Sequence, residues 1–162
     1  MAAPWTSPLG IAAVLFLLAG GFHLLIGVMT PLAIRYFPND PTLFVSERSD
    51  TKTFGESPQE KFAADPAWRI YRNFVLEILA GLLVALGLLE MMVAWVGVRN
   101  GQTWAVGILT ATTLLLVLYW VLAFQPYVRA GAPLTLADLP PFIWFPTALE
   151  LPAVVLAWIG MR

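Results

Sequence analysis

The sequence contains no cysteine, so the protein forms no disulfide, carries no thiol nucleophile and binds no metal through thiolates. Charge is also scarce: Asp, Glu, Lys and Arg make up 12% of the 162 residues, the net charge is −1, and no basic run occurs. The electrostatic footprint of a nucleic-acid-binding protein is therefore missing. Glycine-rich phosphate loops, nucleophile elbows and zinc-type motifs are missing as well. These absences exclude the enzyme classes that such motifs define.

Hydrophobic residues, in contrast, make up 59% of the chain, and the mean hydropathy is +0.78. Four apolar runs are each long enough to cross a hydrocarbon core of ~30 Å as a helix. The first run lacks the basic flank and the cleavage site of a signal peptide, so we expect it to be a span. The sequence predicts an all-α, polytopic membrane protein in which residues 1–162 form a single domain. This four-transmembrane-helix bundle would have helices at about 9–36, 66–98, 103–128 and 139–161.

One long polar loop, residues 37–65, separates the first two predicted spans and holds most of the charges in near balance. Ser57 and Glu60 have the spacing of a capping box, and Pro58 occupies the first helical position. We therefore expect a short interfacial helix near residues 58–64. The remaining charges of the loop are expected to form a solvated surface.

Proline and glycine predict two further features of the spans. Asn100 and Gly101 have the chemistry of a helix C-cap, so the second and third spans should form a tight antiparallel hairpin. Pro146 and Pro152 lie inside the fourth span, and we expect them to kink or interrupt it.

Lysine and arginine divide unequally between the two ends of the predicted bundle. The end that carries the polar loop has seven of them: Arg35, Arg48, Lys52, Lys61, Arg69, Arg72 and Arg129. The other end has only Arg99 and Arg162. By the positive-inside rule, the long loop should be cytoplasmic and both termini should lie outside.

Three ionisable residues fall near the middle of predicted spans: His23, Glu90 and Glu150. A charged residue at the centre of a membrane helix costs roughly 2.5–3.5 kcal/mol on insertion scales, so such residues usually have a partner or a function. Each lies on a helical stripe of small residues, and small residues mark the interfaces between membrane helices. We therefore expect all three to face inward as candidate catalytic groups for proton transfer.

Glu150 carries the most specific expectation. Pro152 leaves a backbone carbonyl of the fourth span without its helical donor. We predict that Glu150 is neutral and hydrogen-bonded to that carbonyl, to His23 or to a hydroxyl of the third span. Thr112 and Tyr119 share a stripe on the third span, and Thr147 lies one turn before Glu150, so these three are candidate ligand-binding residues.

A structural role is the alternative for the same residues, because buried polar contacts also fix the register of membrane helices. With a single histidine and no ligand spacing, the sequence indicates no metal site and no cofactor. Glu77 lies near the loop end of the second span, within reach of Asn73 and basic residues. It fits an interfacial polar cluster or, alternatively, a gate residue at the mouth of a ligand pocket.

Two resemblances cover most of the chain. Residues 99–105 (Arg-Asn-Gly-Gln-Thr-Trp-Ala), with Asp65-Pro66 and the glycine-rich second span before them, resemble small four-helix bacterial membrane proteins of unknown function. That resemblance implies no activity.

Residues 66–68 and 74–77, together with residues 101–104 and 110–113 and the proline-bearing last span, resemble the EXPERA group. This group includes the sigma-2 receptor and the emopamil-binding sterol isomerase. The resemblance implies a pocket for a sterol-like or cationic amphiphile, with Glu77 as the matching acid.

Our leading hypothesis is an integral membrane protein that binds a small hydrophobic or lipid-like ligand in the bundle core. His23, Glu90 and Glu150 would be its polar groups, with acid–base isomerase or cyclase chemistry as one option. The first alternative is a non-catalytic accessory or assembly subunit of a larger membrane complex, and the second alternative is a small transporter. The expected partners are the lipid bilayer, a hydrophobic small molecule, and membrane protein subunits or a second copy of the chain, but not nucleic acid.

Overall fold

A computed structural model describes residues 2–37 and 45–162. All the regular secondary structure in that part of the chain is helical. Residues 38–44 of the predicted polar loop lie outside the described residues. The helices are α1 (Pro8–Tyr36), α2 (Glu47–Phe54), α3 (Pro58–Ala64), α4 (Pro66–Val96), the 3₁₀ turn η1 (Val98–Asn100), α5 (Thr103–Arg129) and α6 (Pro141–Gly160).

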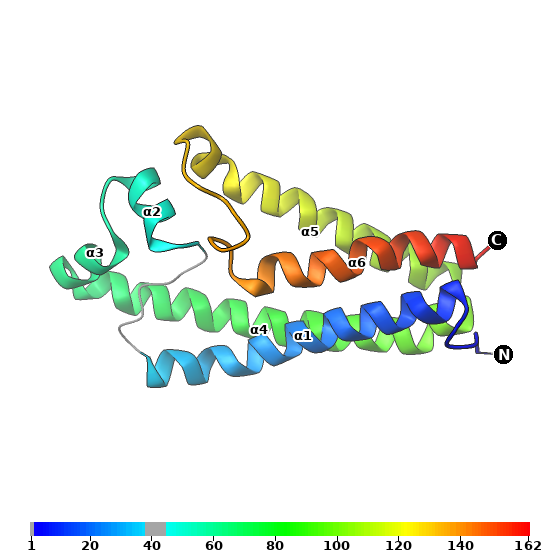
Figure 1. The fold of residues 1–162 in the computed structure, drawn as a ribbon. Helices are drawn as coiled ribbons and strands as arrows, with labels where there is room; N and C mark the ends of the chain where they lie inside the picture. Colours follow the sequence, from blue (N-terminus) through cyan, green and yellow to red (C-terminus); the bar gives the residue numbers. More distant parts are fainter. Residues whose placement is uncertain (1, 38–44) are drawn as a thin grey trace.

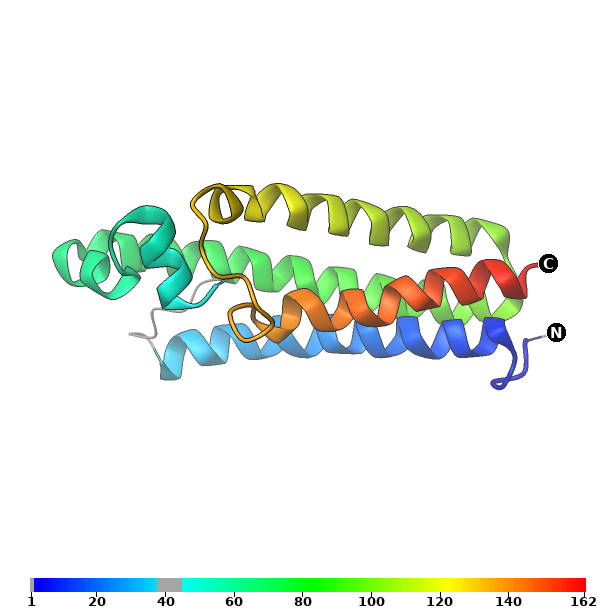
Figure 2. The same ribbon diagram turned by 45° about the horizontal axis from the view of Figure 1, so that its top comes forward.

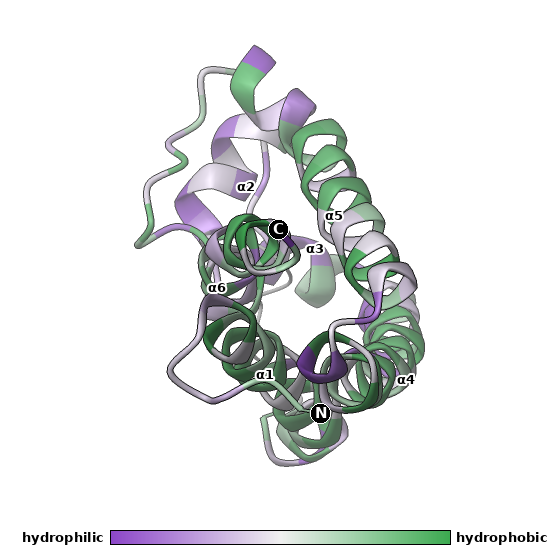
Figure 3. Cartoon of the chain, turned by 90° about the vertical axis from the view of Figure 1, so that its right-hand side faces the viewer, coloured by the Kyte–Doolittle hydropathy of each residue, from purple (hydrophilic) through white to green (hydrophobic). Residues whose placement is uncertain are grey.

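Four of these helices, α1, α4, α5 and α6, are long and apolar enough to cross a membrane, which confirms the predicted fold class. They run side by side, and the two chain termini lie together at one end of the bundle (Figure 1). We call this the termini end. The short helices α2 and α3 lie at the opposite end, the loop end, where the hydrophilic residues gather (Figure 3).

Helix α1 makes most of the contacts that hold the bundle together, because it packs along both α4 and α6. Helix α5 touches α6 and α4 more sparsely: it meets α6 near the termini end and diverges from it toward the loop end (Figures 1 and 2). The buried core lies between α1, α4, α6 and the first half of α5. Its residues are mostly small, with Ala12, Ala13, Ala94, Ala105, Ala153 and Ala157 around Phe16.

Capping side chains mark where α3 and α4 begin. The predicted capping box is present: the backbone N–H of Glu60 donates to Ser57 Oγ, and the backbone N–H of Ser57 donates to Glu60 Oε2. Asp65 caps α4 by accepting from the backbone N–H of Ala67 at 2.9 Å. At the other end of α4, Gly101 adopts the left-handed conformation (φ 68°) that lets the chain turn into α5.

Two features differ from the predictions. Helix α6 continues through Pro146 and Pro152, so neither proline interrupts the span. Helix α2 was not predicted, because its sequence is almost entirely polar and carries no apolar periodicity. It forms over Glu47–Phe54 and ends at Gly55, which has a positive φ of 83°.

Asp138 holds α2 against the loop that connects α5 to α6. Its carboxylate accepts hydrogen bonds from the Arg48 guanidinium, from Ser46 Oγ at 2.6 Å, and from the hydroxyl and backbone N–H of Thr135. These donors, the Arg48 guanidinium first, hold the pKa of Asp138 far below its usual range. Ser49 Oγ adds a hydrogen bond to the Pro133 carbonyl. This part of the loop is therefore docked onto the loop between α5 and α6, while most of its described charged side chains are exposed, as expected.

Candidate functional site

His23, Glu90 and Glu150 meet in the core of the bundle, as their small-residue stripes predicted. They come from α1, α4 and α6, and their exposed fractions are only 2%, 3% and 0%. His23 Nδ1 and Glu90 Oε2 are 2.8 Å apart and share a hydrogen bond. One nitrogen or oxygen from each of the three side chains lies within 4.8 Å of the others. We call these residues the core cluster.

Glycines bring α1 and α4 close enough for this contact. A Cβ atom on Gly87 would lie 2.4 Å from the Gly20 carbonyl oxygen, and one on Gly20 would lie 2.8 Å from the Gly87 carbonyl oxygen. A third glycine of α1, Gly27, sits as tightly against Ala80. Gly20 and Gly87 are one helical turn from His23 and Glu90, so the backbones approach most closely beside the hydrogen bond. Small residues at a membrane-helix interface have this effect in general.

The carboxylate of Glu150 differs from the other two groups of the cluster. Both of its oxygens are buried, and neither has a hydrogen-bond partner among the described residues. Its polar neighbours include Glu90, His23 and the hydroxyl of Thr113 on α5. Of the partners predicted for Glu150, His23 directs Nδ1 to Glu90 instead, whereas a hydroxyl of the third span, that of Thr113, does lie beside the carboxyl group.

The candidate ligand-binding residues lie apart from the core cluster. Tyr119 is 66% exposed and faces outward, so the inward orientation that we expected is wrong. Thr112 is half-buried, and the buried threonine of α5 is its neighbour Thr113. Thr147 donates to the backbone carbonyl of Ile143 in its own helix and lines a groove between α5 and α6. The cavities described below are not lined by residues of the core cluster, whose three side chains are buried.

Glu77 is exposed on α4, and it has no hydrogen bond or ion pair among the residues that the structure describes. Within the polar cluster expected around it, the Arg72 guanidinium donates to the amide oxygen of Asn73 at 2.8 Å. Glu77 does not line the cavities described below.

An aromatic cavity lies at the loop end, enclosed by α2, α3 and the adjoining ends of α4 and α5. We call it the loop-end pocket; its volume is about 470 Å³, within the range of small-molecule sites. Its lining combines aromatic rings with a few charged groups: Asp50, Phe54, Glu56, Ser57, Pro58, Lys61, Phe62, Trp68, Tyr71, Arg72, Val75 and Tyr127.

The charged groups of the loop-end pocket are already arranged around its rings. The Lys61 ammonium lies 4.7 Å from the centre of the Trp68 ring and pairs with Glu56. The Arg72 guanidinium lies 5.2 Å from the centre of the Phe62 ring. Phe54 and Tyr127 make an edge-to-face contact at 5.7 Å. These are the stacking and cation–π geometries that bind organic cations.

Asp50 supplies the buried acid of this pocket. Its Oδ1 accepts a hydrogen bond of 2.7 Å from the Tyr127 hydroxyl, whereas its Oδ2 is buried with no partner among the described residues. Burial raises the pKa of Asp50, and the hydrogen bond from Tyr127 opposes that shift only in part. The pocket therefore contains one oxygen that lacks a donor.

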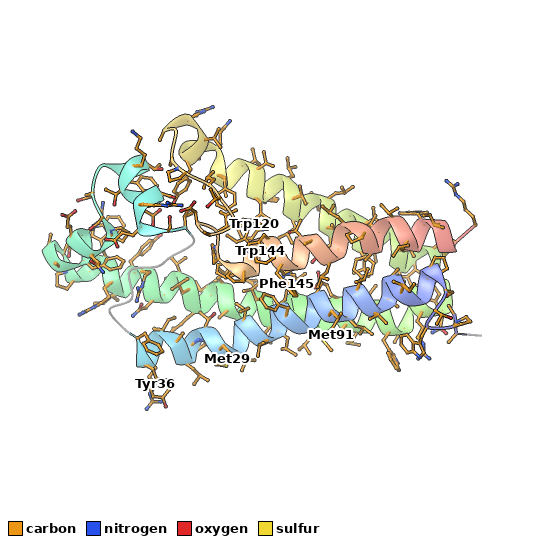
Figure 4. The ribbon with its side chains drawn as sticks, in the orientation of Figure 1. Met29, Tyr36, Met91, Trp120, Trp144 and Phe145 are labelled. Atoms are coloured by element: carbon orange, nitrogen blue, oxygen red, sulfur yellow. The ribbon has the colours of Figure 1, made fainter. Side chains whose placement is uncertain are left out.

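A second apolar surface is the groove between α5 and α6, with a volume of about 510 Å³. Trp120 and Trp144 line it from opposite helices, and Figure 4 shows them close together near the point where the helices diverge. The indole nitrogen of each is buried without a partner among the described residues. Phe145 points the other way, onto Phe22 of α1, with ring centres 4.8 Å apart.

Sequence reasoning missed Thr113 and Asp50. Thr113 lies four residues after Leu109 and eight after Ala105, on the stripe of α5 that faces the core, but α5 is apolar nearly throughout, so composition does not single out that stripe. Asp50 had no local signal either, because its burial depends on a partner, Tyr127, that is 77 residues away in the chain.

No family model, no curated protein and no solved structure matches this chain.

Proposed function

We propose that this integral membrane protein binds a lipid-like amphiphile with a cationic amine head in the loop-end pocket. The observation that carries the proposal is Asp50 Oδ2, a buried acidic oxygen without a donor, in a cavity lined by aromatic rings. A primary or tertiary ammonium group would donate to this oxygen and lie against the rings of Phe54 and Tyr127.

The position of the pocket fits the rest of such a ligand. Trp68, Tyr71 and Tyr127 line it at the ends of α4 and α5, and aromatic side chains of this kind mark the depth of lipid headgroups. An amphiphile bound there would keep its head at the interface and its apolar tail beside Val75 and the hydrocarbon region. By the positive-inside rule, this interface is the cytoplasmic one.

This proposal moves the ligand from the bundle core, where the sequence placed it, to the loop end. The core cluster is closed, so it does not line the pocket, and acid–base chemistry on the amphiphile is not part of the proposal. The acid that matches the ammonium is Asp50 rather than Glu77, the residue that the EXPERA resemblance implied.

Two probes that have the same alkyl chain, one with a cationic head and one with a neutral head, test the proposal. Binding of dodecylamine and of neutral dodecanol to the protein in nanodiscs would be measured through quenching of tryptophan fluorescence. We expect the amine to bind about tenfold more tightly or better, since a charge-assisted hydrogen bond to a buried carboxylate contributes about 1.5–3 kcal/mol. Asp50→Asn should remove that preference while keeping the acceptor for Tyr127.

Glu47→Gln is the matched control, because Glu47 is an exposed acid on the same helix and loses the same charge. It should bind the amine as the wild type does. Equal binding of amine and alcohol by the wild type, or an unchanged preference in Asp50→Asn, would refute the proposal.

The closed core favours a second candidate function, a non-catalytic subunit of a larger membrane complex. Polar residues that only fix helix register are expected to be packed as tightly as His23 and Glu90 are. Cross-linking in native membranes, followed by mass spectrometry, tests this function: reproducible adducts with one other membrane protein would support it, and adducts with lipids alone would not.

A further inference from the structure

The core cluster combines one imidazole and two carboxylates at a spacing that suits a metal ion. One donor atom from each of His23, Glu90 and Glu150 lies within 4.8 Å of the other two. Nitrogen and oxygen ligands bind Zn²⁺ at ~2.0–2.2 Å, which sets their mutual separations at roughly 3–4.4 Å. The observed limit of 4.8 Å lies just outside this range. The sequence gave no sign of this spacing, because each ligand comes from a different helix.

Glu150 supplies a second, independent observation. Its side chain is completely buried, points at His23 and Glu90, and leaves both oxygens without a hydrogen-bond donor. A bound cation would satisfy this carboxylate.

The charges of the ligands fit a divalent ion. As metal ligands the two glutamates are carboxylates and the histidine is neutral, so a divalent cation leaves the cluster uncharged. The hydrogen bond between His23 Nδ1 and Glu90 would then be replaced by two bonds to the ion.

We propose that the core cluster binds one first-row divalent transition metal ion through His23 Nδ1 and one oxygen each of Glu90 and Glu150. Imidazole with carboxylates suits Zn²⁺, Fe²⁺ and Mn²⁺, whereas an all-oxygen site would suit Mg²⁺ or Ca²⁺. The ion joins α1, α4 and α6 in the middle of the membrane-spanning region. It is independent of the ligand proposed for the loop-end pocket.

Metal content of the purified protein is the direct test. The chain would be produced in medium supplemented with Zn²⁺, Fe²⁺ and Mn²⁺, purified in detergent without chelator, and analysed by inductively coupled plasma mass spectrometry. We expect about one ion per chain, since buried structural and catalytic metal sites bind stoichiometrically. X-ray absorption of the same sample should show nitrogen and oxygen ligands at ~2.0–2.2 Å.

Variants separate this site from adventitious binding by surface acids. Glu150→Gln loses no hydrogen bond that the structure shows, so it should fold, as judged by circular dichroism and gel filtration, and its metal content should fall by about tenfold or more. Glu77→Gln removes an exposed carboxylate from α4 and should keep the metal content of the wild type.

His23→Gln should also lose the ion. Because this substitution removes the hydrogen bond to Glu90 as well, its result supports the site only if Glu150→Gln gives the same result. A wild-type protein that carries far less than one ion per chain after growth in the supplemented medium would overturn the proposal. Equal metal content in the wild type and in Glu150→Gln would overturn it as well.

Discussion

Replacing Gly87 by alanine should push α1 and α4 apart at the core cluster. A Cβ atom at this position would lie 2.4 Å from the carbonyl oxygen of Gly20 and 2.7 Å from the backbone nitrogen of Leu24. Ordinary van der Waals contact begins at 3.4 Å, so the two backbones must separate by about 1.0 Å, the difference between 3.4 and 2.4 Å. Both obstructing atoms belong to the backbone of α1, which cannot rotate out of the way as a side chain can.

That displacement is large enough to break the hydrogen bond between His23 and Glu90. The two side chains are 2.8 Å apart, and a further 1.0 Å along the contact gives about 3.8 Å. Hydrogen bonds between nitrogen and oxygen span about 2.7–3.2 Å, so the bond would be lost. Overpacking typically costs about 1–3 kcal/mol, and a membrane hydrogen bond contributes about 0.6–2 kcal/mol. We therefore expect Gly87→Ala to lower the free energy of unfolding by about 2–4 kcal/mol.

Thermal unfolding in a non-ionic detergent, followed by circular dichroism, measures this loss as a decrease in Tm of ~5–15 °C. Gly81→Ala is the matched control on the same helix, since nothing lies within 4 Å of the position of its added Cβ atom. Alanine is the better helix former, so this variant should unfold at the wild-type temperature or above it. If Gly87→Ala and Gly81→Ala unfolded at the same temperature, the close contact between α1 and α4 would be wrong.

Three further predictions concern the core, the loop and the orientation. In metal-free protein, Glu150→Leu should raise the free energy of unfolding by about 1–3 kcal/mol, because it removes a buried carboxylate whose oxygens have no hydrogen-bond partner. A decrease in Tm would show instead that Glu150 holds the helices together. Because the pKa of Asp138 is lowered in the folded protein, its contribution to stability is complete above the unfolded aspartate pKa near pH 4 and is lost progressively as the pH falls below that value. Hydrogen exchange in α2 should therefore accelerate below pH 4 in the wild type, and far less so in Arg48→Ala. Thr6 and Lys52 are both exposed, and each can be replaced by cysteine for labelling from outside with an impermeant maleimide. The Thr6→Cys variant should react and the Lys52→Cys variant should not. Preferential labelling of Lys52→Cys would show the opposite topology.

Helical periodicity was sufficient to predict which residues of α1, α4 and α6 face the core. His23, Glu90 and Glu150 each share a stripe with small residues, and small residues gather where membrane helices meet. The pairing of these residues was not predictable. It depends on α1 lying directly against α4, and only the glycine contacts of Gly20 and Gly87 establish that neighbourhood.

The orientation of α5 shows where periodicity fails. Thr112 and Tyr119 are seven residues apart and do share a stripe, but the stripe that faces the core contains Ala105, Leu109 and Thr113. A shift of one residue rotates a helical stripe by about 100°, which turns an interior position into a flank. Because nearly all of α5 is apolar, neither stripe stands out in composition. The contacts with α6 decide between them.

The buried aspartates of the loops were not predicted for a different reason. Most of the described charged side chains of the polar loop are exposed, as the balanced charge predicts, but Asp50 is buried, and so is Asp138 of the loop between α5 and α6. Arg48 and Asp138 are 90 residues apart, and Tyr127 reaches Asp50 across 77 residues. Polar contacts of such long range carry no local pattern, so only a three-dimensional structure reveals them.

The structure separates the two proposed sites along the bundle. Arg72 lines the loop-end pocket and Glu90 belongs to the core cluster, and both lie on α4. The 18 residue steps from Arg72 to Glu90, at 1.5 Å each, correspond to about 27 Å of helix. An amphiphile whose head bound Asp50 could not present that head to Glu150, so the two proposals require different ligands. For this reason the closed packing of His23, Glu90 and Glu150 counts against an active site for lipids while it favours a site for an ion, which needs no cavity larger than its own coordination shell.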